Sequence, residues 1–461
     1  MAKRTTLTFL GAAGTVTGSK FLVQSGDRAI LIEAGMFQGE KELRDLNWAE
    51  FPVPPERITD VLITHAHMDH VGYLPVLVRQ GFAGTVWATP ATIRLSEIVL
   101  RDAGYLNERD AEHANDRGYS RHTPALPLYD SADVERTLPL FSPIDYDTEL
   151  GLGEDIVARY VRAGHILGSA SIHLRVGGRS ILVSGDVGRH DHPVLRSRDT
   201  PPGATTVLIE STYGDREHPE PEGPGHEALA DLIRRTVKRG GSVLVPAFAV
   251  DRTEVVLKTL TEMQADGRIP QVPIFVNSPM ALAALAVYRD PAFRDELRPD
   301  LDPEHFVDLP NLREVHTTEE SMKLNTPKVP CLIISSSGMA TGGRVLHHLE
   351  HMLPDHRHAV VLVGYQAVGT RGRALIEGVG QLKMHGRYVP VRAEVMQDNE
   401  FSVHGDRSDL LDWLAALTPP PTTVFTVHGN ADVAASFGRR ISEQLGCLSI
   451  VPTLGETVRI D

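Results

Sequence analysis

The sequence predicts an α/β protein with more than one domain. From about residue 209 onward, short apolar runs such as 242–248 and 359–365 alternate with helical segments, the pattern of a mostly parallel, doubly wound sheet. These runs are apolar throughout, so helices should cover both faces of that sheet. The chain has 461 residues, whereas one domain holds about 150, which favours two or three domains.

The composition is ordinary for a globular protein, with 41% hydrophobic and 23% charged residues. The start of the chain reads as a first strand, and no apolar run approaches the ~20 residues needed to span a bilayer. Cys331 and Cys447 lie near apolar runs and are expected in the core, which fits a reducing, cytoplasmic compartment. The net charge of −14 argues against a protein that coats nucleic acid, but it does not exclude a nuclease with a local basic groove.

The densest chemical signal is a stretch that holds His65, His67, Asp69 and His70. An apolar strand over 58–63 precedes it, and one helix ending at Gly81 is expected after it. Imidazole and carboxylate groups suit zinc or a similar metal. Four groups at this spacing reach two ions more easily than one. We therefore expect two metals, and the alternative is a solvated, His-rich turn.

The strands that flank this stretch in sequence contribute further candidates. Residues 5–35 predict strands with a hairpin around Gly26 and Asp27, which ends at Glu33. Glu33 is either an acceptor behind the metal ligands or a surface acid. Residues 170–184 alternate around Gly177–Gly178 and predict a tight hairpin.

Four polar residues stand at predicted strand ends beside glycines: His165, Asp186, His404 and His428. Taken singly, such residues are more often structural. With the His-rich stretch upstream, we expect His165 to complete the first metal site, His428 to complete the second, and Asp186 to bridge them. His404 is then left as a candidate acid. The last residues, 448–461, predict one more strand pair.

Three turns at strand ends after residue 240 carry small and basic residues. Strand ends of open α/β sheets bind ligands, and arginine with backbone N–H groups suits phosphate. The turns predict a groove for a polyanion. No P-loop motif is present, so the sequence does not favour binding of a nucleotide cofactor. The candidate substrate-binding residues are Arg252, Ser337, Gly338, Arg344 and Arg371.

The sequence resembles a known family over almost its whole length. The segments H-A-H-M-D-H, A-G-H-I-L-G-S, S-G-D-V-G-R and T-V-H-G resemble the metal motifs of the metallo-β-lactamase fold. The segments E-S-T-Y-G-D-R-E-H, P-A-F-A-V-D-R-T, S-P-M-A, S-S-S-G-M-A-T-G-G-R and F-S-V-H-G-D resemble those of β-CASP proteins. The resemblance implies an αββα sandwich formed by residues 1–208 and 394–461, with a β-CASP domain inserted as residues 209–393.

The resemblance also implies a role for each candidate. His65, His67 and His165 would bind one zinc, and Asp69, His70 and His428 the other, with Asp186 bridging; Asp69 is also counted as catalytic. Glu210 matches the acid that would orient His404, and His404 the group that protonates the leaving oxygen. His428 matches a motif position where RNA-acting members have His and DNA-repair members usually have Val. Glu33, Asn277 and Asp251 depart from the family's more usual Asp, Asp and Gly.

The predicted function is a ribonuclease with two Zn²⁺ per chain that hydrolyses phosphodiester bonds of single-stranded RNA by a two-metal-activated hydroxide. Endonuclease action is favoured and exonuclease action stays open. The expected setting is cytoplasmic, without a membrane, with single-stranded RNA as partner and a homodimer left open. Three alternatives remain: a DNA nuclease of the same superfamily, a small-molecule metallo-hydrolase, and a non-catalytic scaffold subunit. His428 disfavours the DNA nuclease. A small-molecule hydrolase would not need the inserted domain. A non-catalytic scaffold would be expected to have lost some of the metal-binding residues, whereas all seven are present.

Overall fold

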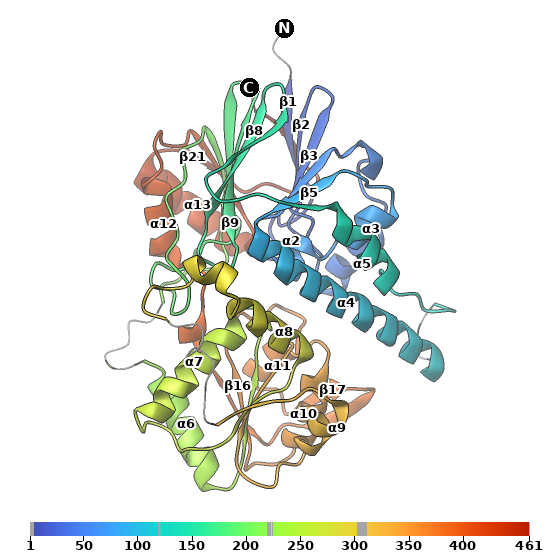
Figure 1. Ribbon diagram of the computed structural model, residues 1–461, viewed down its shortest axis with the longest axis vertical. Helices are drawn as coiled ribbons and strands as arrows, with labels where there is room; N and C mark the ends of the chain where they lie inside the picture. Colours follow the sequence, from blue (N-terminus) through green and yellow to red (C-terminus); the bar gives the residue numbers. More distant parts are fainter. Residues whose placement is uncertain are drawn as a thin grey trace. The chain divides into compact units, whose positions relative to one another are not determined.

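The computed structural model describes residues 4–118, 120, 122–218, 223, 225–301 and 311–460. The chain folds into two compact units, each described by itself (Figure 1). Unit 1 comprises Met1–Glu217 and His404–Asp461, and unit 2 comprises His218–Val403. Unit 1 is therefore built from two segments that are far apart in the sequence.

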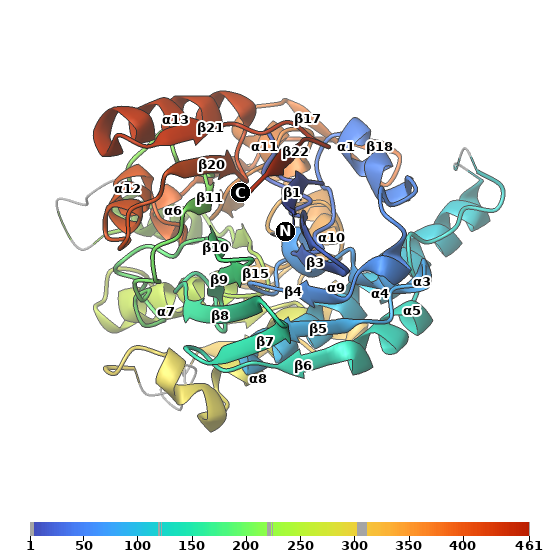
Figure 2. The same cartoon turned by 90° about the horizontal axis from the view of Figure 1, so that it is seen from above.

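Unit 1 contains two seven-stranded sheets among the described residues. The first has the order β22-β1-β2-β3-β4-β5-β6, with β1 (Thr5–Phe9), β2 (Phe21–Ser25), β3 (Arg28–Ile32), β4 (Asp60–Leu62), β5 (Thr85–Ala88), β6 (Phe141–Pro143) and β22 (Thr457–Arg459). The second has the order β21-β20-β11-β10-β9-β8-β7, with β7 (Glu149–Gly153), β8 (Ile156–Arg162), β9 (Ala170–Val176), β10 (Arg179–Val183), β11 (Thr206–Glu210), β20 (Thr423–Val427) and β21 (Leu448–Ile450). Figure 2 shows the two sheets next to each other.

The two sheets pack face to face because successive side chains of a strand point to opposite faces. In β2, Phe21 and Val23 join the core between the sheets, whereas Leu22 joins the core beneath the helices. Phe9 of the first sheet and Phe425 of the second meet in the middle, with ring centroids 4.9 Å apart. The sandwich is therefore held by one shared apolar core.

Helices cover the outer face of each sheet of unit 1 and complete four layers. On the first sheet the outer core includes Leu77, Leu100 and Val134 of three helices, and on the second it includes Trp413 and Phe437 of two others. The helices are α1 (Lys41–Asp45), α2 (Met68–Val71), α3 (Leu74–Arg79), α4 (Pro90–Arg117), α5 (Ser131–Thr137), α12 (Arg407–Ala415) and α13 (Ala431–Leu445). Short 3₁₀ turns are η1 (Leu46–Trp48), η2 (Pro55–Arg57) and η3 (Leu138–Leu140).

Unit 2 is built on a six-stranded sheet in which all paired strands are parallel. Its order is β14-β13-β15-β12-β16-β19, with β12 (Val243–Pro246), β13 (Ile274–Val276), β14 (Leu312–Glu314), β15 (Leu332–Ser335), β16 (Ala359–Leu362) and β19 (Glu394–Gln397). A separate hairpin pairs β17 (Gln381–Met384) with β18 (Arg387–Pro390).

Helices lie on both sides of the unit 2 sheet. They are α6 (Glu227–Lys238), α7 (Arg252–Ala265), α8 (Pro279–Tyr288), α9 (Thr318–Lys323), α10 (Arg344–Met352) and α11 (Arg371–Ile376), with η4 (Pro291–Glu296) and η5 (Asn399–Phe401) as 3₁₀ turns. Figure 1 shows α6 and α7 on one side of β16 and α9 and α10 on the other. The predicted fold class, an αββα sandwich with a parallel, doubly wound sheet in the insertion, is confirmed.

Two local predictions were wrong. The helix expected after the His-rich stretch is split at Gly72–Tyr73 into α2 and α3, because the Tyr73 N–H donates to the Ala34 carbonyl and Pro75 starts a new helix. The two last strands do not pair with each other. Instead β21 extends the second sheet beside β20, and β22 extends the first beside β1, so the end of the chain ties both sheets together.

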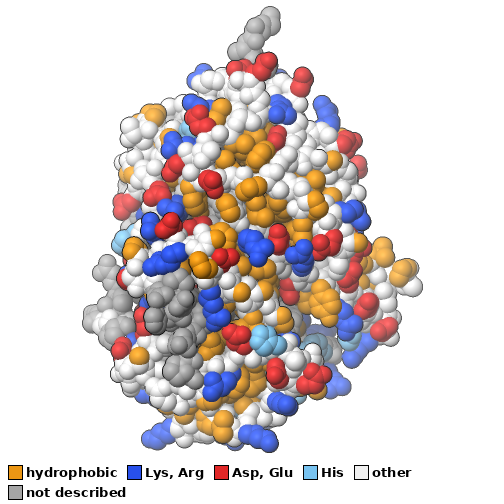
Figure 3. Space-filling model, viewed as in Figure 1, with side chains coloured by type: hydrophobic (Ala, Val, Ile, Leu, Met, Phe, Trp, Pro, Cys, Tyr) orange, Lys and Arg blue, Asp and Glu red, His pale blue; other side chains and the backbone are white. Residues whose placement is uncertain are grey.

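No helix in the described part of the chain is both long and apolar enough to cross a bilayer. On the face shown in Figure 3, acidic and basic side chains are interspersed. The net negative charge is thus not gathered into one patch on this face.

Lys20 is a buried cation at the start of β2. Its side chain lies between two aromatic rings, with Nζ 4.2 Å from the centroid of Phe37 and 4.9 Å from that of Tyr73. The ammonium also donates to the carbonyl of Gly18 at 3.2 Å. Burial lowers the pKa of Lys20 to about 7, because the charged form loses its hydration.

Replacing Lys20 should change how stability depends on pH. The pKa rises from about 7 in the folded chain toward 10.5 in the unfolded chain. The unfolded state therefore binds more protons between these values, and stability rises with pH across that window. Lys20→Met should flatten this rise, as measured by urea unfolding at several pH values. Lys41→Met, at an exposed lysine, is the control, and an unchanged slope in Lys20→Met would contradict the assignment.

Candidate metal centre

Strand ends of unit 1 bring the polar residues together. Strands β10, β11 and β20 are neighbours and run parallel, so their carboxyl ends meet at one edge of the second sheet. Asp186 follows β10, Glu210 ends β11, and His428 follows β20. In the first sheet β3 and β4 are also parallel, and they lead into Glu33 and the His-rich loop. The order of the strands thus dictates which residues meet.

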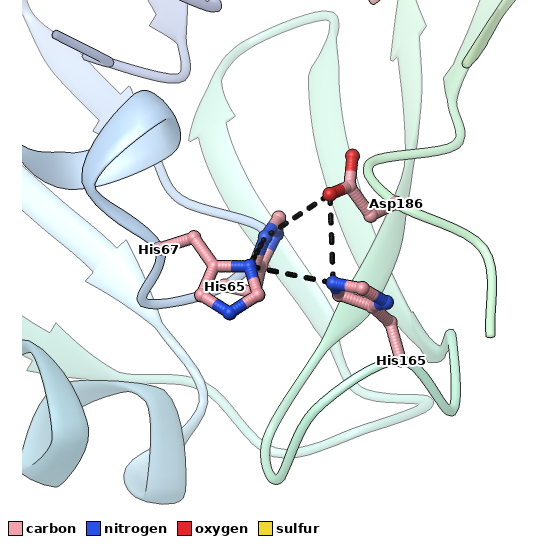
Figure 4. Close-up of side chains that lie close together, drawn as sticks. All are labelled: His65, His67, His165 and Asp186. Carbon is pink, nitrogen blue, oxygen red and sulfur yellow. Dashed lines mark hydrogen bonds and ion pairs between the residues drawn. The ribbon is translucent and has the colours of Figure 1, made fainter. Parts of the chain in front are cut away.

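Four side chains form the first group: His65, His67, His165 and Asp186 (Figure 4). Nδ1 of His67 lies 3.1 Å from Nε2 of His65 and 3.3 Å from Nε2 of His165. Oδ2 of Asp186 lies 3.5 Å from Nε2 of both His65 and His165. Donor atoms around a tetrahedral zinc at ~2.0–2.1 Å are spaced by roughly 3.3 Å, so these separations fit one ion.

Three side chains form the second group: Asp69, His70 and His428. The Nε2 atoms of His70 and His428 are 3.1 Å apart, and Oδ2 of Asp69 lies 3.5 Å from Nε2 of His428. Asp186 reaches this group too, with Oδ1 at 3.4 Å from Nε2 of His70. One carboxylate therefore presents an oxygen to each group.

The protonation states of His65 and His67 suit metal binding. Burial lowers the pKa of His65 well below its ordinary value and that of His67 to about 4, so both rings are neutral at pH 7 with a lone pair to offer. Burial alone would raise the pKa of Asp69, but the hydrogen bond from His428 and the charge of His70 hold it below the usual range. Oδ1 of Asp186 is buried without a hydrogen-bond partner in the described residues. A buried carboxylate oxygen is costly unless a cation offsets it, and clustered imidazole and carboxylate groups have the donor chemistry of a metal-binding site.

Hydroxyl groups behind the ligands fix two of the rings, and sequence reasoning missed them. The Thr64 hydroxyl lies 2.9 Å from Nδ1 of His65, and the Thr212 hydroxyl lies 3.2 Å from Nδ1 of His428. A partner on one ring nitrogen sets the tautomer and leaves the other nitrogen for a metal. For Thr64 the available signal was its position at a predicted strand end, whereas no predicted strand ended near Thr212.

Glu33 lies beside the cluster, which decides between the two roles that the sequence left open for it. Its Oε1 accepts a hydrogen bond from the Thr64 N–H at 3.1 Å, and Oε2 lies 3.6 Å from Nδ1 of His70. The charges of Asp186 and Glu33 outweigh the effect of burial and raise the pKa of His70 to about 10. Glu33 is therefore placed as an acceptor behind the ring of His70.

Glu210, His404 and Asp186 form a third group at the rim of the cluster. Nδ1 of His404 lies 3.3 Å from Oε2 of Glu210 and 3.9 Å from Oδ2 of Asp186. The Val187 N–H donates to Oε1 of Glu210 at 2.6 Å, which fixes the carboxylate. The rings of His404 and His165 lie 4.4 Å apart, so a glutamate-oriented imidazole stands directly beside the first metal group.

The five predicted substrate-binding residues lie in unit 2, at one edge of its sheet. Strands β15, β12 and β16 are parallel neighbours. Arg344, Arg252 and Arg371 are the first residues of the helices α10, α7 and α11 that follow them. Ser337 and Gly338 lie in the turn between β15 and α10. The structure thus aligns three helix N-termini along one edge, where backbone N–H groups favour anions.

Part of the arginine hydrogen-bonding capacity is used within the protein. Arg344 donates to Oδ1 of Asn277 at 2.8 Å and to the His316 carbonyl at 3.2 Å. Arg371 donates to the carbonyls of Lys383 and Thr341. Arg252 is only 6% exposed. Their contact with phosphate stays a prediction.

The structure explains what two departures from the family pattern do. Asn277 is fully buried, and its amide group donates to Ser321 and lies 2.6 Å from Nε2 of His348; an aspartate could not make both contacts in this way. Asp251 has a φ of 66°, a left-handed conformation that glycine adopts more easily. The Tyr288 hydroxyl donates to Oδ1 of Asp251 at 2.9 Å, which helps to hold it there.

An αββα sandwich with buried His and Asp groups at its strand ends defines a metal-dependent hydrolase. Comparison with known families agrees. Residues 13–247 match the metallo-beta-lactamase superfamily, residues 253–375 the Beta-Casp domain, and residues 388–452 the Zn-dependent metallo-hydrolase RNA specificity domain. The chain belongs to the β-CASP family of the metallo-β-lactamase superfamily.

Individual relatives cover nearly the whole chain. It is 38% identical over 440 residues to "Ribonuclease TTHA0252" of Thermus thermophilus, covering 94% of this chain and 95% of that protein. It is 30% identical over 457 residues to "RNase J-like protein" of Methanocaldococcus jannaschii, covering 98% and 99%, and 31% identical over 473 residues to "Transcription termination factor FttA" of Methanosarcina mazei, covering 98% and 71%.

A solved structure of a protein of unknown function from Enterococcus faecalis V583 has the same overall fold. Its TM-score is 0.53 at 14% identity, over 99% of this chain and 100% of that one. At this identity the likeness concerns the fold alone.

Removing the hydroxyl behind His65 should weaken metal binding without unfolding the chain. Thr64→Val keeps the side-chain shape but loses the bond to Nδ1, and losing such a partner typically costs about 10–100-fold in metal affinity. The affinity is measured by competition with a chelator. Thr59→Val, at a threonine whose hydroxyl donates to the Ala29 carbonyl, is the matched control. Equal metal affinity in the two variants would contradict the role of Thr64.

Proposed function

We propose that this protein is a zinc-dependent ribonuclease that hydrolyses phosphodiester bonds of single-stranded RNA with two zinc ions per chain. The observation that carries the proposal is the position of His404, held by Glu210 beside a paired set of metal donors. The match to an RNA specificity domain and the ribonuclease relatives support RNA as the substrate.

The ligands follow from the two groups of donors. His65, His67 and His165 would hold one zinc, Asp69, His70 and His428 the other, and Asp186 would contribute an oxygen to each. When bound, two zinc ions offset phosphate charge and lower the pKa of water toward ~7. The side chain of Asp69 is 23% exposed, whereas those of Asp186 and His428 are 2% and 6% exposed. Asp69 is therefore placed to accept a hydrogen bond from the attacking water as well.

His404 is the proposed general acid. Its Nδ1 faces Glu210, and Nε2 is the nitrogen that would donate a proton to the leaving oxygen. Glu210 orients the ring, while its own carboxylate is held by the Val187 N–H. Such acid catalysis typically contributes about 10²–10⁴-fold.

The edge of the unit 2 sheet is the proposed binding surface for the RNA backbone. The N-termini of α7, α10 and α11 direct backbone N–H groups and Arg252, Arg344 and Arg371 toward one edge, with Ser337 and Gly338 in the turn between β15 and α10. Such a surface contacts phosphate rather than bases, and it therefore positions a strand without reading its sequence.

The proposal is tested with zinc-loaded protein and end-labelled oligonucleotides. We expect cleavage of single-stranded RNA and no comparable cleavage of single-stranded DNA with the same sequence. The product ladder shows whether cleavage is internal or begins at an end. DNA cleavage at an equal rate, or hydrolysis of nitrocefin or a thioester without RNA cleavage, would contradict the proposal.

Two substitutions should separate acid catalysis from metal binding. His404→Ala should keep both zinc ions and lower the rate of RNA cleavage by about 10²–10⁴-fold. Asp186→Ala should lose metal as well as activity, because it removes the oxygens shared by the two groups. Metal content by mass spectrometry and initial rates give both readouts. His356→Ala, at a side chain that is 83% exposed, is the control. Full activity of His404→Ala would rule out the acid role.

A further inference from the structure

Unit 2 contains a second set of side chains with the chemistry of a metal site: His347, Glu350 and His385. His347 and Glu350 stand three residues apart on α10 and so share one face of the helix. His385 comes from the turn of the β17–β18 hairpin. Its Nδ1 lies 3.2 Å from Oε2 of Glu350, and its ring lies 4.9 Å from that of His347 at an angle of 27°.

The hairpin turn holds His385 in an uncommon conformation. Met384 pairs with Arg387, which leaves His385 and Gly386 as a two-residue turn with φ values of 45° and 78°. Turns with positive φ at both positions favour Asn-Gly or Asp-Gly. Histidine is thus not required by the backbone. It adds an imidazole that lies against α10.

An ion pair with Glu350 would account for only one of the two imidazoles. A divalent cation would account for all three groups, because two imidazoles and a carboxylate all act as donors to it. The three donor atoms lie within 4.8 Å of one another, close enough for small side-chain rotations to complete the site.

We propose that His347, Glu350 and His385 bind a divalent first-row metal ion such as Zn²⁺ and thereby tie the β17–β18 hairpin to α10. Two imidazoles and one carboxylate suit zinc, cobalt or nickel, whereas calcium and magnesium prefer all-oxygen ligands. The side chains of Glu350 and His385 are 27% and 32% exposed. Water therefore fills the remaining positions, and the ion exchanges more easily than one in the buried cluster of unit 1.

Equilibrium dialysis against graded zinc concentrations tests the site in the full chain. Bound zinc is counted by mass spectrometry for the wild type, His385→Asn and Glu350→Gln. We expect the wild type to bind one equivalent more than either variant, whatever number of ions unit 1 holds. Asparagine suits the turn, so His385→Asn keeps the hairpin, and circular dichroism confirms that each variant is folded.

His351→Gln is the matched control, since His351 lies on the same helix with Nδ1 bonded to the His347 carbonyl. It should bind as much zinc as the wild type. Equal zinc binding by the wild type and His385→Asn at every concentration would overturn the proposal. So would loss of the same equivalent in His351→Gln, because the effect would then not depend on the three named side chains.

Discussion

The burial of many imidazoles and carboxylates in one small volume is the constraint on which unit 1 depends. His65, His165 and Asp186 are each 2% exposed or less, and water cannot solvate their donor atoms. Such groups are tolerated when they are held at fixed positions and share a cation. The sandwich provides those positions, because each donor follows a strand that is fixed in a sheet. A metal ion bound by these donors would therefore stabilise the fold, and the fold in turn positions the donors.

Close backbone packing holds the loops that carry the donors. A side chain at Gly35 would place its Cβ 1.6 Å from the Asp69 carbonyl oxygen, and one at Gly429 would lie 2.1 Å from the Ser211 hydroxyl. The loop of Asp69 and the turn after His428 therefore pack so closely against neighbouring atoms that only glycine fits at these two positions. Together with Thr64 and Thr212 behind the rings, this packing leaves the donors little freedom. Rigid placement lowers the entropy lost when a metal binds.

Unit 2 positions its proposed RNA-binding residues by the same principle. Parallel neighbours β15, β12 and β16 bring three helix N-termini to one edge, where fixed N–H groups and arginines favour anions. The helix α10 combines two chemistries, since Arg344 begins it and His347 and Glu350 follow one and two turns later. An ion bound there would fix the hairpin on the helix that begins with a residue of the proposed RNA surface.

The sequence alone determined the α/β class and singled out the seven residues proposed as metal donors, because strand periodicity and histidines at strand ends are local signals. It could not reveal Thr64 and Thr212 as partners of the rings, since hydroxyl residues near strand ends are common. The sequence also led us to predict one helix where α2 and α3 are separate, because the hydrogen bond from Tyr73 to Ala34 is a long-range contact. For the same reason it led us to pair β21 with β22, although the two strands belong to different sheets. Only the tertiary structure decided which donors meet, since distances between residues as remote as His70 and His428 are set by strand order.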